Sequence, residues 1–353
     1  MSGQLSILIV DDSAFFCHRL EDLFSQANDM QVVGYASDGE MAVQMARELR
    51  PDIITMDVQM PVLDGISAVR RIMAECPTPI LMLSAHTRQG ANETLKALEA
   101  GAVDFLTKEW SALGGGSAAG GFTEHFLHKV REVARSRLPA RRTAGSAFRN
   151  VSLRPVRQKF SPQTGHLKLI AIGASTGGPV ALQVILSSLP RHFPLPIVAA
   201  VHMPGSFTTA YAERLNSLSA IEVKEAADRD ALRPGRVLIA PGGKQMLVDK
   251  GASGGMVRIK EALPGDVYHP SVDQLLDSTA RTFGDQALGL ILTGMGSDGL
   301  QGGRKMKALG AQIWSQDEKS CVVYGMPHAV AKAGLSDRVL TLDDMGPQLM
   351  KQQ

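Results

Sequence analysis

Short apolar runs alternate with amphipathic helical patterns along most of this chain, in two successive blocks. In the first block the runs predicted as strands are Ser6–Val10, Gln31–Tyr35, Asp52–Met56, Pro79–Leu83 and Val103–Leu106. The predicted helices are Ala14–Ala27, Glu40–Leu49, Gly65–Glu75, Asn92–Ala100 and Phe122–Leu138. Strands that alternate with helices form a parallel sheet covered by helices on both faces. The first block is therefore predicted to be an α/β domain of this doubly wound kind.

The second block has the same alternation and predicts a second parallel sheet. Its predicted strands are Leu169–Ile172, Ile197–Val201, Arg236–Ala240, Leu288–Thr293 and Ala311–Ser315. Its predicted helices are Pro179–Ser188, Thr208–Ser217, Ser271–Phe283 and Gly302–Leu309. A length of 353 residues also favours two domains, because single cores stop growing below this size.

The segment between the blocks has a different composition. From Val133 to Lys168 there is no acidic residue against nine Lys or Arg, and three prolines interrupt the chain. We predict an N-terminal domain over residues 1–138, a linker over 139–166 and a C-terminal domain over 167–353. A solvated linker is favoured over an anion-binding site, since composition alone rarely marks a site. The glycine-rich segment 114–121 is expected to be a flexible loop.

Composition limits the possible partners and the compartment. A net charge of +2 implies neither a nucleic-acid nor a membrane partner. The three cysteines are far apart and odd in number, which argues against a disulfide framework and favours a reducing, cytoplasmic setting. The apolar run Leu5–Val10 ends at two aspartates and has no basic leader, so it is predicted to be neither a signal peptide nor a membrane span.

Polar residues follow four strands of the first block, at the edge where parallel sheets bind ligands. Asp11 and Asp12 follow the first strand, Asp57 the third, Ser84 the fourth and Lys108 the fifth. Three convergent carboxylates repel one another, and Mg²⁺ is the natural counter-ion for oxygen ligands of this kind. A cation there would orient a phosphoryl group at Asp57, with the serine and the lysine near its oxygens. Any one of these residues alone would be an ordinary loop residue.

Residues 5–110 resemble a response-regulator receiver domain, a flavodoxin-like fold. The matching strings are Val10-Asp11-Asp12-Ser13, Met56-Asp57-Val58-Gln59-Met60-Pro61-Val62-Leu63-Asp64-Gly65, Leu83-Ser84-Ala85 and Asp104-Phe105-Leu106-Thr107-Lys108. The resemblance implies that a histidine kinase phosphorylates Asp57, that Asp11, Asp12 and Asp57 hold Mg²⁺, and that Ser84, Lys108 and Phe105 are the phosphate and switch residues. The family usually has proline after this lysine, whereas this chain has Glu109. We expect a trans bond there, because a cis bond before a non-proline residue costs about 3 kcal/mol.

The second block opens with a strand that ends in Gly173-Ala174-Ser175-Thr176-Gly177, the G-x-S-x-G form of a nucleophile elbow. The free N–H groups of the following helix would stabilise an oxyanion there, or bind a phosphate. A serine nucleophile needs a base and a group that orients the base. His202 ends the next strand and Asp298 follows the strand Leu288–Thr293. The order Ser, His, Asp differs from that of α/β-hydrolases.

A different interpretation of the same loop is dinucleotide binding. The segment from Gly294 to Gly299 is a literal G-x-G-x-x-G between a strand and a helix. Asp317 and Glu318 lie about 20 residues further on, where a ribose-binding acid would be expected. Taken singly, His202 would more often be a structural histidine, and Asp298 a helix cap. Their occurrence together with Ser175 favours hydrolysis.

Residues 167–345 resemble the catalytic domain of the chemotaxis protein-glutamate methylesterase family, a Rossmann-like fold. The matching strings are Ile172-Gly173-Ala174-Ser175-Thr176-Gly177-Gly178-Pro179, His202-Met203-Pro204, Phe207-Thr208, Ala212-Glu213-Arg214-Leu215-Asn216, Ala240-Pro241-Gly242-Gly243, His269-Pro270-Ser271-Val272-Asp273 and Leu292-Thr293-Gly294-Met295-Gly296-Ser297-Asp298-Gly299. The resemblance implies Ser175 as nucleophile, His202 as general acid and base, and Asp298 as the orienting acid. The backbone N–H groups of Thr176 and Met295 are the implied oxyanion donors. Gln245 stands where many members have histidine.

The implied substrate is a glutamate γ-methyl ester on the cytoplasmic helices of chemoreceptors, and the same chemistry would deamidate certain receptor glutamines. The receiver would cover the site until phosphorylation uncovers it. A DNA-binding regulator is the rival for any receiver protein, but the second block is too long and too rich in strands for a helix-turn-helix. A silent adaptor is disfavoured because all three triad positions are filled.

Overall fold

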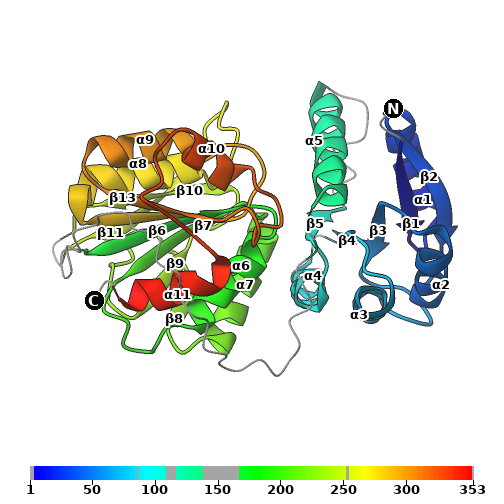
Figure 1. Cartoon of the computed structure of the whole chain (residues 1–353), viewed down its shortest axis with the longest axis horizontal. Helices are drawn as coiled ribbons and strands as arrows, with labels where there is room; N and C mark the ends of the chain where they lie inside the picture. The colour runs from blue at the N-terminus through cyan, green and yellow to red at the C-terminus, as the bar shows by residue number, and fades with distance from the viewer. Residues whose placement is uncertain are drawn as a thin grey trace.

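The computed structural model describes residues 4–85, 87–108, 117–136, 138, 167–251 and 254–351. The linker and Glu109 lie outside these residues, as do the first three residues of the glycine-rich segment. The chain forms two α/β lobes, each built on a parallel sheet (Figure 1). The predicted fold class, two doubly wound parallel-sheet domains, is confirmed.

The first sheet has five parallel strands in the order β2-β1-β3-β4-β5. Its strands are β1 (Leu5–Val10), β2 (Met30–Ala36), β3 (Ile53–Asp57), β4 (Ile80–Ser84) and β5 (Asp104–Thr107). Its helices are α1 (Ala14–Ser25), α2 (Gly39–Leu49), α3 (Gly65–Glu75), α4 (Arg88–Ala100) and α5 (Ser117–Ala134). Each predicted strand and helix of this block is present, with ends shifted by a few residues.

Alternation of side chains along the strands explains why helices cover both faces of this sheet. In β1, Ile7 and Ile9 pack with the apolar residues of α1 and α5. Leu8 and Val10 point to the opposite face and pack with α2, α3 and α4. Strands that are apolar at every position are typical of a parallel sheet buried on both sides.

Helix α5 begins earlier than the sequence predicts. It starts at Ser117, inside the segment expected to be a loop, and ends at Ala134 rather than Leu138. The first turns of α5 combine alanines, which favour a helix, with two glycines, which together cost about 2 kcal/mol. Because these propensities oppose each other, packing of the amphipathic part of the helix determines that the helix forms. The chain then turns, with the Ser136 N–H donating to the Val133 carbonyl at 3.0 Å.

The second sheet has seven strands in the order β14-β13-β12-β6-β7-β9-β8, all paired in parallel. Its strands are β6 (Leu169–Ala174), β7 (Ile197–Val201), β8 (Glu222–Glu225), β9 (Arg236–Ile239), β12 (Ala287–Ile291), β13 (Gln312–Gln316) and β14 (Arg338–Leu340). Its helices are α6 (Gly178–Ser187), α7 (Gly205–Leu218), α8 (Val272–Phe283), α9 (Leu300–Ala308), α10 (Met326–Lys332) and α11 (Leu342–Met350). A separate antiparallel hairpin, β10 (Lys244–Asp249) with β11 (Met256–Glu261), packs against α8.

Strand order places the candidate catalytic residues at one edge of this sheet. The chain runs outward from β6 through β7 on one side, and later returns through β12 on the other side. Ligands bind in the crevice outside the carboxyl ends of the strands, where the strand order reverses. Ser175 follows β6, His202 follows β7, and Asp298 lies in the loop after β12. All three therefore lie around this crevice.

The two lobes are packed together through α4, α5 and β5 of the first lobe (Figure 1). Helix α4 packs on α7, and the Phe105 ring stacks on Phe207 with centroids 4.4 Å apart. Glu99 accepts two hydrogen bonds from the Arg214 guanidinium, at 2.7 and 2.5 Å. One apolar cluster contains buried residues of both lobes, so the interface is continuous with the cores.

Candidate active site and phosphorylation site

Ser175 lies on a tight turn between β6 and α6. Its N–H donates to the Thr293 carbonyl at 3.1 Å, and its carbonyl accepts from the Gly178 N–H at 2.7 Å. Gly177 has a φ of +75°, in the left-handed region that favours glycine, and is the N-cap of α6. The side chain of Ser175 is almost buried, and the serine faces a cavity at the carboxyl edge of the sheet.

Close approach of a second loop explains Gly294. A Cβ atom at this position would lie 2.8 Å from the Ser175 Cβ and 2.4 Å from the Met326 sulfur. Any larger residue would therefore push the loop after β12 away from the serine. Glycine here keeps the backbone of the Gly294–Gly299 segment against the nucleophile turn.

His202 is fixed by its backbone and by its ring. Its N–H donates to the Ala174 carbonyl at 3.1 Å, which keeps the residue beside the serine turn. Its ring Nε2 lies 2.9 Å from Oδ2 of Asp298. Since Nε2 pairs with the carboxylate, any proton exchange with the Ser175 hydroxyl would have to use Nδ1.

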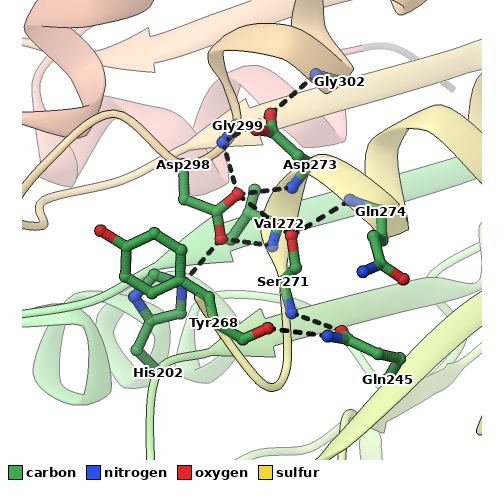
Figure 2. A network of polar contacts seen from close by, with 10 residues as sticks. All are labelled: His202, Gln245, Tyr268, Ser271, Val272, Asp273, Gln274, Asp298, Gly299 and Gly302. Carbon is green, nitrogen blue, oxygen red and sulfur yellow. Dashed lines mark hydrogen bonds and ion pairs between the residues drawn. The ribbon is translucent and has the colours of Figure 1, made fainter. Parts of the chain in front are cut away.

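Asp298 is the centre of a hydrogen-bond network (Figure 2). Its carboxylate accepts from the backbone N–H groups of Val272 at 2.7 Å and Asp273 at 2.8 Å, and from the Ser271 hydroxyl at 3.2 Å. These donors form the N-terminus of α8, where a negative charge is favoured. Burial by itself would raise the pKa of Asp298, but the bond to His202 and these N–H groups hold it below its ordinary value. The carboxylate is thus kept charged while it faces the imidazole.

Among the described residues, the backbone N–H groups of Thr176 and Met295 donate to no backbone carbonyl of a turn or loop. Thr176 follows the serine, and Met295 lies in the loop that Gly294 brings close. Unpaired N–H groups beside a nucleophile are what an oxyanion hole requires. These are the same two residues that the family resemblance implies.

The catalytic cavity has a volume of about 470 Å³ and walls from both lobes. Ser175, His202, Tyr268 and Met295 line it from the second lobe, and the first lobe contributes Asp104, Phe105, Leu106, Thr107, His125 and Lys129. The Lys129 ammonium donates to the Thr176 hydroxyl at 3.0 Å and lies 2.5 Å from the Asp104 carboxylate. Both Lys129 and Thr176 are buried, so the first lobe closes over the serine turn.

The glycine-rich loop after β12 has a role other than cradling a phosphate. Asp298, inside the motif, is directed to His202 and to the start of α8. Asp317, the candidate ribose-binding acid, accepts from the N–H and hydroxyl of Ser320 in its own turn. The geometry therefore favours hydrolysis over dinucleotide binding.

The predicted acidic cluster of the first lobe is assembled. Oxygen atoms of Asp11, Asp12 and Asp57 all lie within 4.8 Å of one another. The Lys108 ammonium lies 2.7 Å from Asp11 and 3.0 Å from Asp57. Burial raises the pKa of Asp57, and the nearby lysine offsets this only in part. Three carboxylates in reach of one point are a donor set that suits Mg²⁺.

Ser84 and Phe16 complete the surroundings of Asp57. Ser84 is fully buried and lines a cavity of about 310 Å³ together with Asp57 and Lys108. The lysine ammonium also lies 4.4 Å from the centroid of the Phe16 ring. A phosphoryl group on Asp57 would enter this cavity, with a hydroxyl and an ammonium on its walls.

Each of the two lobes matches a known protein family. Residues 7–113 match the response regulator receiver domain and residues 170–349 match the CheB methylesterase domain. A protein-glutamate methylesterase/protein-glutamine glutaminase of Colwellia psychrerythraea is 45% identical over 98% of both chains. One of Pseudomonas aeruginosa is 46% identical over 98% of this chain and 99% of that protein.

This chain belongs to the CheB methylesterase family. The prediction of an ester hydrolase with a receiver domain is confirmed. The crystal structure of the CheB methylesterase catalytic domain of Thermotoga maritima is 38% identical, with a TM-score of 0.51. The matched region covers 52% of this methylesterase and 97% of the Thermotoga chain. No helix in the described part of the chain is long and apolar enough to cross a membrane.

Sequence reasoning did not find two residues of this site, Lys129 and Tyr268, and it gave a third, Gln245, no role. Lys129 belongs to the first lobe, and no local pattern links it to a residue after the linker. Tyr268 stacks on His202, but only its position directly before the His269-Pro270 motif could have indicated it. The Gln245 side chain bonds to the backbone of Tyr268 and Ser271, on either side of that motif.

Proposed function

We propose that this protein removes methyl groups from glutamate methyl esters on chemoreceptors, and deamidates receptor glutamines, under control of its receiver domain. The observation that carries the proposal is the Ser175 turn beside a paired His202 and Asp298, in a cavity that the receiver closes. Full-length relatives named protein-glutamate methylesterase/protein-glutamine glutaminase support the substrate.

The proposed reaction begins at the serine. Its Oγ attacks the ester carbonyl carbon while the imidazole of His202 takes the hydroxyl proton. Asp298 stabilises the resulting imidazolium, since its carboxylate is held charged by the start of α8. The imidazolium then returns the proton to the methoxide that leaves, so that methanol and an acyl-enzyme are formed.

Water completes the cycle by the same route in reverse. His202 takes a proton from water, whose oxygen attacks the acyl carbon, and the proton passes to the Ser175 Oγ as it leaves. The products are a free glutamate carboxylate and the original serine. With a glutamine substrate the leaving group is ammonia. The N–H groups of Thr176 and Met295 would donate to the oxyanion in both halves of the reaction.

Contacts between the lobes support a gate. The receiver side of the cavity carries Asp104, Phe105 and Lys129, and the strand that holds the first two leads directly to Lys108. A phosphoryl group on Asp57 would bind the Lys108 ammonium and the Ser84 hydroxyl. Because Lys108 directly follows β5, this binding would shift the backbone at the end of that strand. Because Phe105 stacks on Phe207 of α7, a shift of β5 would loosen the lobe contact.

The acidic cluster would hold Mg²⁺ through Asp11, Asp12 and Asp57, and the ion would supply charge neutralisation for the incoming phosphoryl group. Ser84 and Lys108 would donate to the phosphoryl oxygens once the aspartyl phosphate has formed. A chemotaxis histidine kinase is the proposed phosphodonor. Ester hydrolysis itself would need no cofactor. Domain limits of 1–138, 139–166 and 167–353 and a cytoplasmic location remain part of this proposal.

The direct test is methanol release from membranes that carry methylated chemoreceptors. Replacement of Ser175 by alanine is expected to remove activity by at least about 1,000-fold, as loss of a triad nucleophile does. A full-length Ser175→Ala protein that still releases methanol at nearly the normal rate would overturn the assignment. The fragment 166–353 should be faster than the unphosphorylated full chain, and equal rates would overturn the gate.

A further inference from the structure

Tyr268 covers one face of the catalytic imidazole. Its ring is stacked on His202 with centroids 4.4 Å apart and planes 9° from parallel. Figure 2 shows the two rings one over the other, with Asp298 at the edge of the imidazole. The bond to Asp298 holds only one edge of the ring, and a turn of the ring about its Cβ–Cγ bond would change the direction of Nδ1. A flat neighbour on the face opposes such rotation.

The tyrosine is itself held in place by the loop that carries Asp298. A Cβ on Gly296 would lie 3.0 Å from the Tyr268 hydroxyl oxygen, so the phenol end reaches the loop of the oxyanion candidate Met295. The residue also lines the catalytic cavity. Burial, followed by the nearby Asp298 and Asp273 carboxylates, raises the pKa of the phenol. The ring therefore stays neutral while the imidazole changes charge.

Gln245 links Tyr268 to the start of α8, whose groups donate hydrogen bonds to Asp298. This buried side chain donates to the Tyr268 carbonyl at 2.7 Å and accepts from the Ser271 N–H at 2.8 Å. Ser271 in turn donates to Asp298 and caps α8. The Gln245 side chain thus fixes both ends of the segment 268–271. This segment positions Tyr268 and the donors to Asp298, the two residues that contact the His202 ring.

We propose that Tyr268 is a positioning residue, whose aromatic face holds the His202 imidazole in the orientation that serves Ser175 and Asp298. The role rests on the proposed function of the triad. It predicts that the aromatic ring is required and the hydroxyl is not. A neutral aromatic face also suits the imidazolium that forms during each proton transfer.

The test compares Tyr268→Phe with Tyr268→Leu in the full-length protein, activated with a small-molecule acyl phosphate. For methanol release, Tyr268→Phe should keep kcat within about twofold, whereas Tyr268→Leu should lose about tenfold or more in kcat with little change in KM. A thermal melt of each variant checks folding. The phenylalanine variant is the matched control, since it keeps the ring and removes only the hydroxyl.

A second readout separates this role from the choice of substrate. Phenylmethanesulfonyl fluoride reacts at a serine activated by its base and needs no receptor. Its rate at Ser175, measured by intact mass, should fall in Tyr268→Leu by the same factor as kcat and stay unchanged in Tyr268→Phe. The proposal is overturned if Tyr268→Leu keeps normal rates, if Tyr268→Phe loses as much, or if the loss lies in KM. Normal sulfonylation of wild type without methanol release would instead overturn the proposed substrate.

Discussion

The Lys129 ammonium of the receiver donates a 3.0 Å hydrogen bond to the hydroxyl of Thr176, the residue directly after Ser175. The same ammonium pairs with Asp104 at 2.5 Å, on the strand that leads to Lys108. A single buried cation thus connects the strand that leads to Lys108 with the turn that carries the proposed nucleophile, Ser175. This relationship gives the gate a specific contact that can be removed.

Replacement of Lys129 by alanine should raise the activity of the unphosphorylated full chain. The change leaves the Asp104 carboxylate without its cation in a buried interface, and breaking a buried pair costs about 3–5 kcal/mol. We expect basal methanol release to rise by at least about fivefold, toward the rate of fragment 166–353. Arg70→Ala removes an exposed cation of α3 and serves as the charge control. An unchanged basal rate in Lys129→Ala would contradict the contact.

Charge reversal of the Glu99–Arg214 ion pair tests the interface between the two lobes at its edge, where α4 packs on α7. Glu99 and Arg214 are both partly exposed, so loss of this pair alone is worth about 1 kcal/mol or less. Arg214→Glu places two carboxylates together and should raise the basal rate about threefold to tenfold. The double variant Glu99→Arg with Arg214→Glu should restore the low basal rate. Failure of the double variant to restore it would mean that the pair does not hold the lobes together.

Docking of the receiver should weaken in acid through His125. Lost hydration beside the cavity and then the Lys129 charge hold the pKa of His125 below its ordinary value when the lobes are packed. Lys129 lies on the same helix as His125 and acts on it in both states, so only the hydration lost to the second lobe makes the docked state favour the neutral ring. That part of the docking free energy is complete above about pH 6.5 and is lost as the pH falls through the lowered pKa. The ring keeps more than a third of its surface exposed, which makes the effect modest.

The measurement is the ratio of full-length basal activity to the activity of fragment 166–353. Taking a ratio removes the pH effects that the two proteins share. The ratio should rise between about pH 7.5 and about pH 5.5, and His125→Gln should flatten the rise. The groups around His125 are Lys129, His128, Asp104 and His202. A ratio that falls in acid would contradict the assignment.

Asp298→Asn should disable the triad and destabilise the fold. Its carboxylate accepts from the backbone N–H groups of Val272, Asp273 and Gly299, and an amide nitrogen facing any of them would repel it. Loss of an orienting aspartate in a triad lowers kcat by about 10⁴. We expect a fall of at least about 1,000-fold in methanol release, with a lower melting temperature. Activity within tenfold of wild type would show that His202 needs no orienting acid.

The sequence predicted the arrangement of elements because strand-end loops in parallel sheets gather at one edge. Asp11, Asp57 and Ser84 met as expected, since each directly follows a buried apolar run. Strands β8 and β14 were missed because they are short edge strands with partly exposed, polar residues. The hairpin β10–β11 has no helix to mark its connection and was missed for the same lack of pattern.

The contacts that could not be predicted join residues far apart in the sequence, or lie in loops that have no periodic pattern. Lys129 is 47 residues from Thr176, on the other side of the linker, and only packing of the lobes brings them together. Tyr268 lies in an irregular loop whose shape depends on Gln245 and the start of α8. Side chains of this kind show their role only once distant elements are placed.

Ser175 is proposed to hydrolyse receptor methyl esters under a gate controlled at Asp57. The most direct test is the rate of methanol release from methylated receptor membranes, with and without a small-molecule acyl phosphate, for wild type, Asp57→Ala and Ser175→Ala. The phosphodonor should accelerate wild type, have no effect on Asp57→Ala, and fail to restore Ser175→Ala. Equal rates for wild type with and without the phosphodonor, or release by Ser175→Ala, would contradict this proposal.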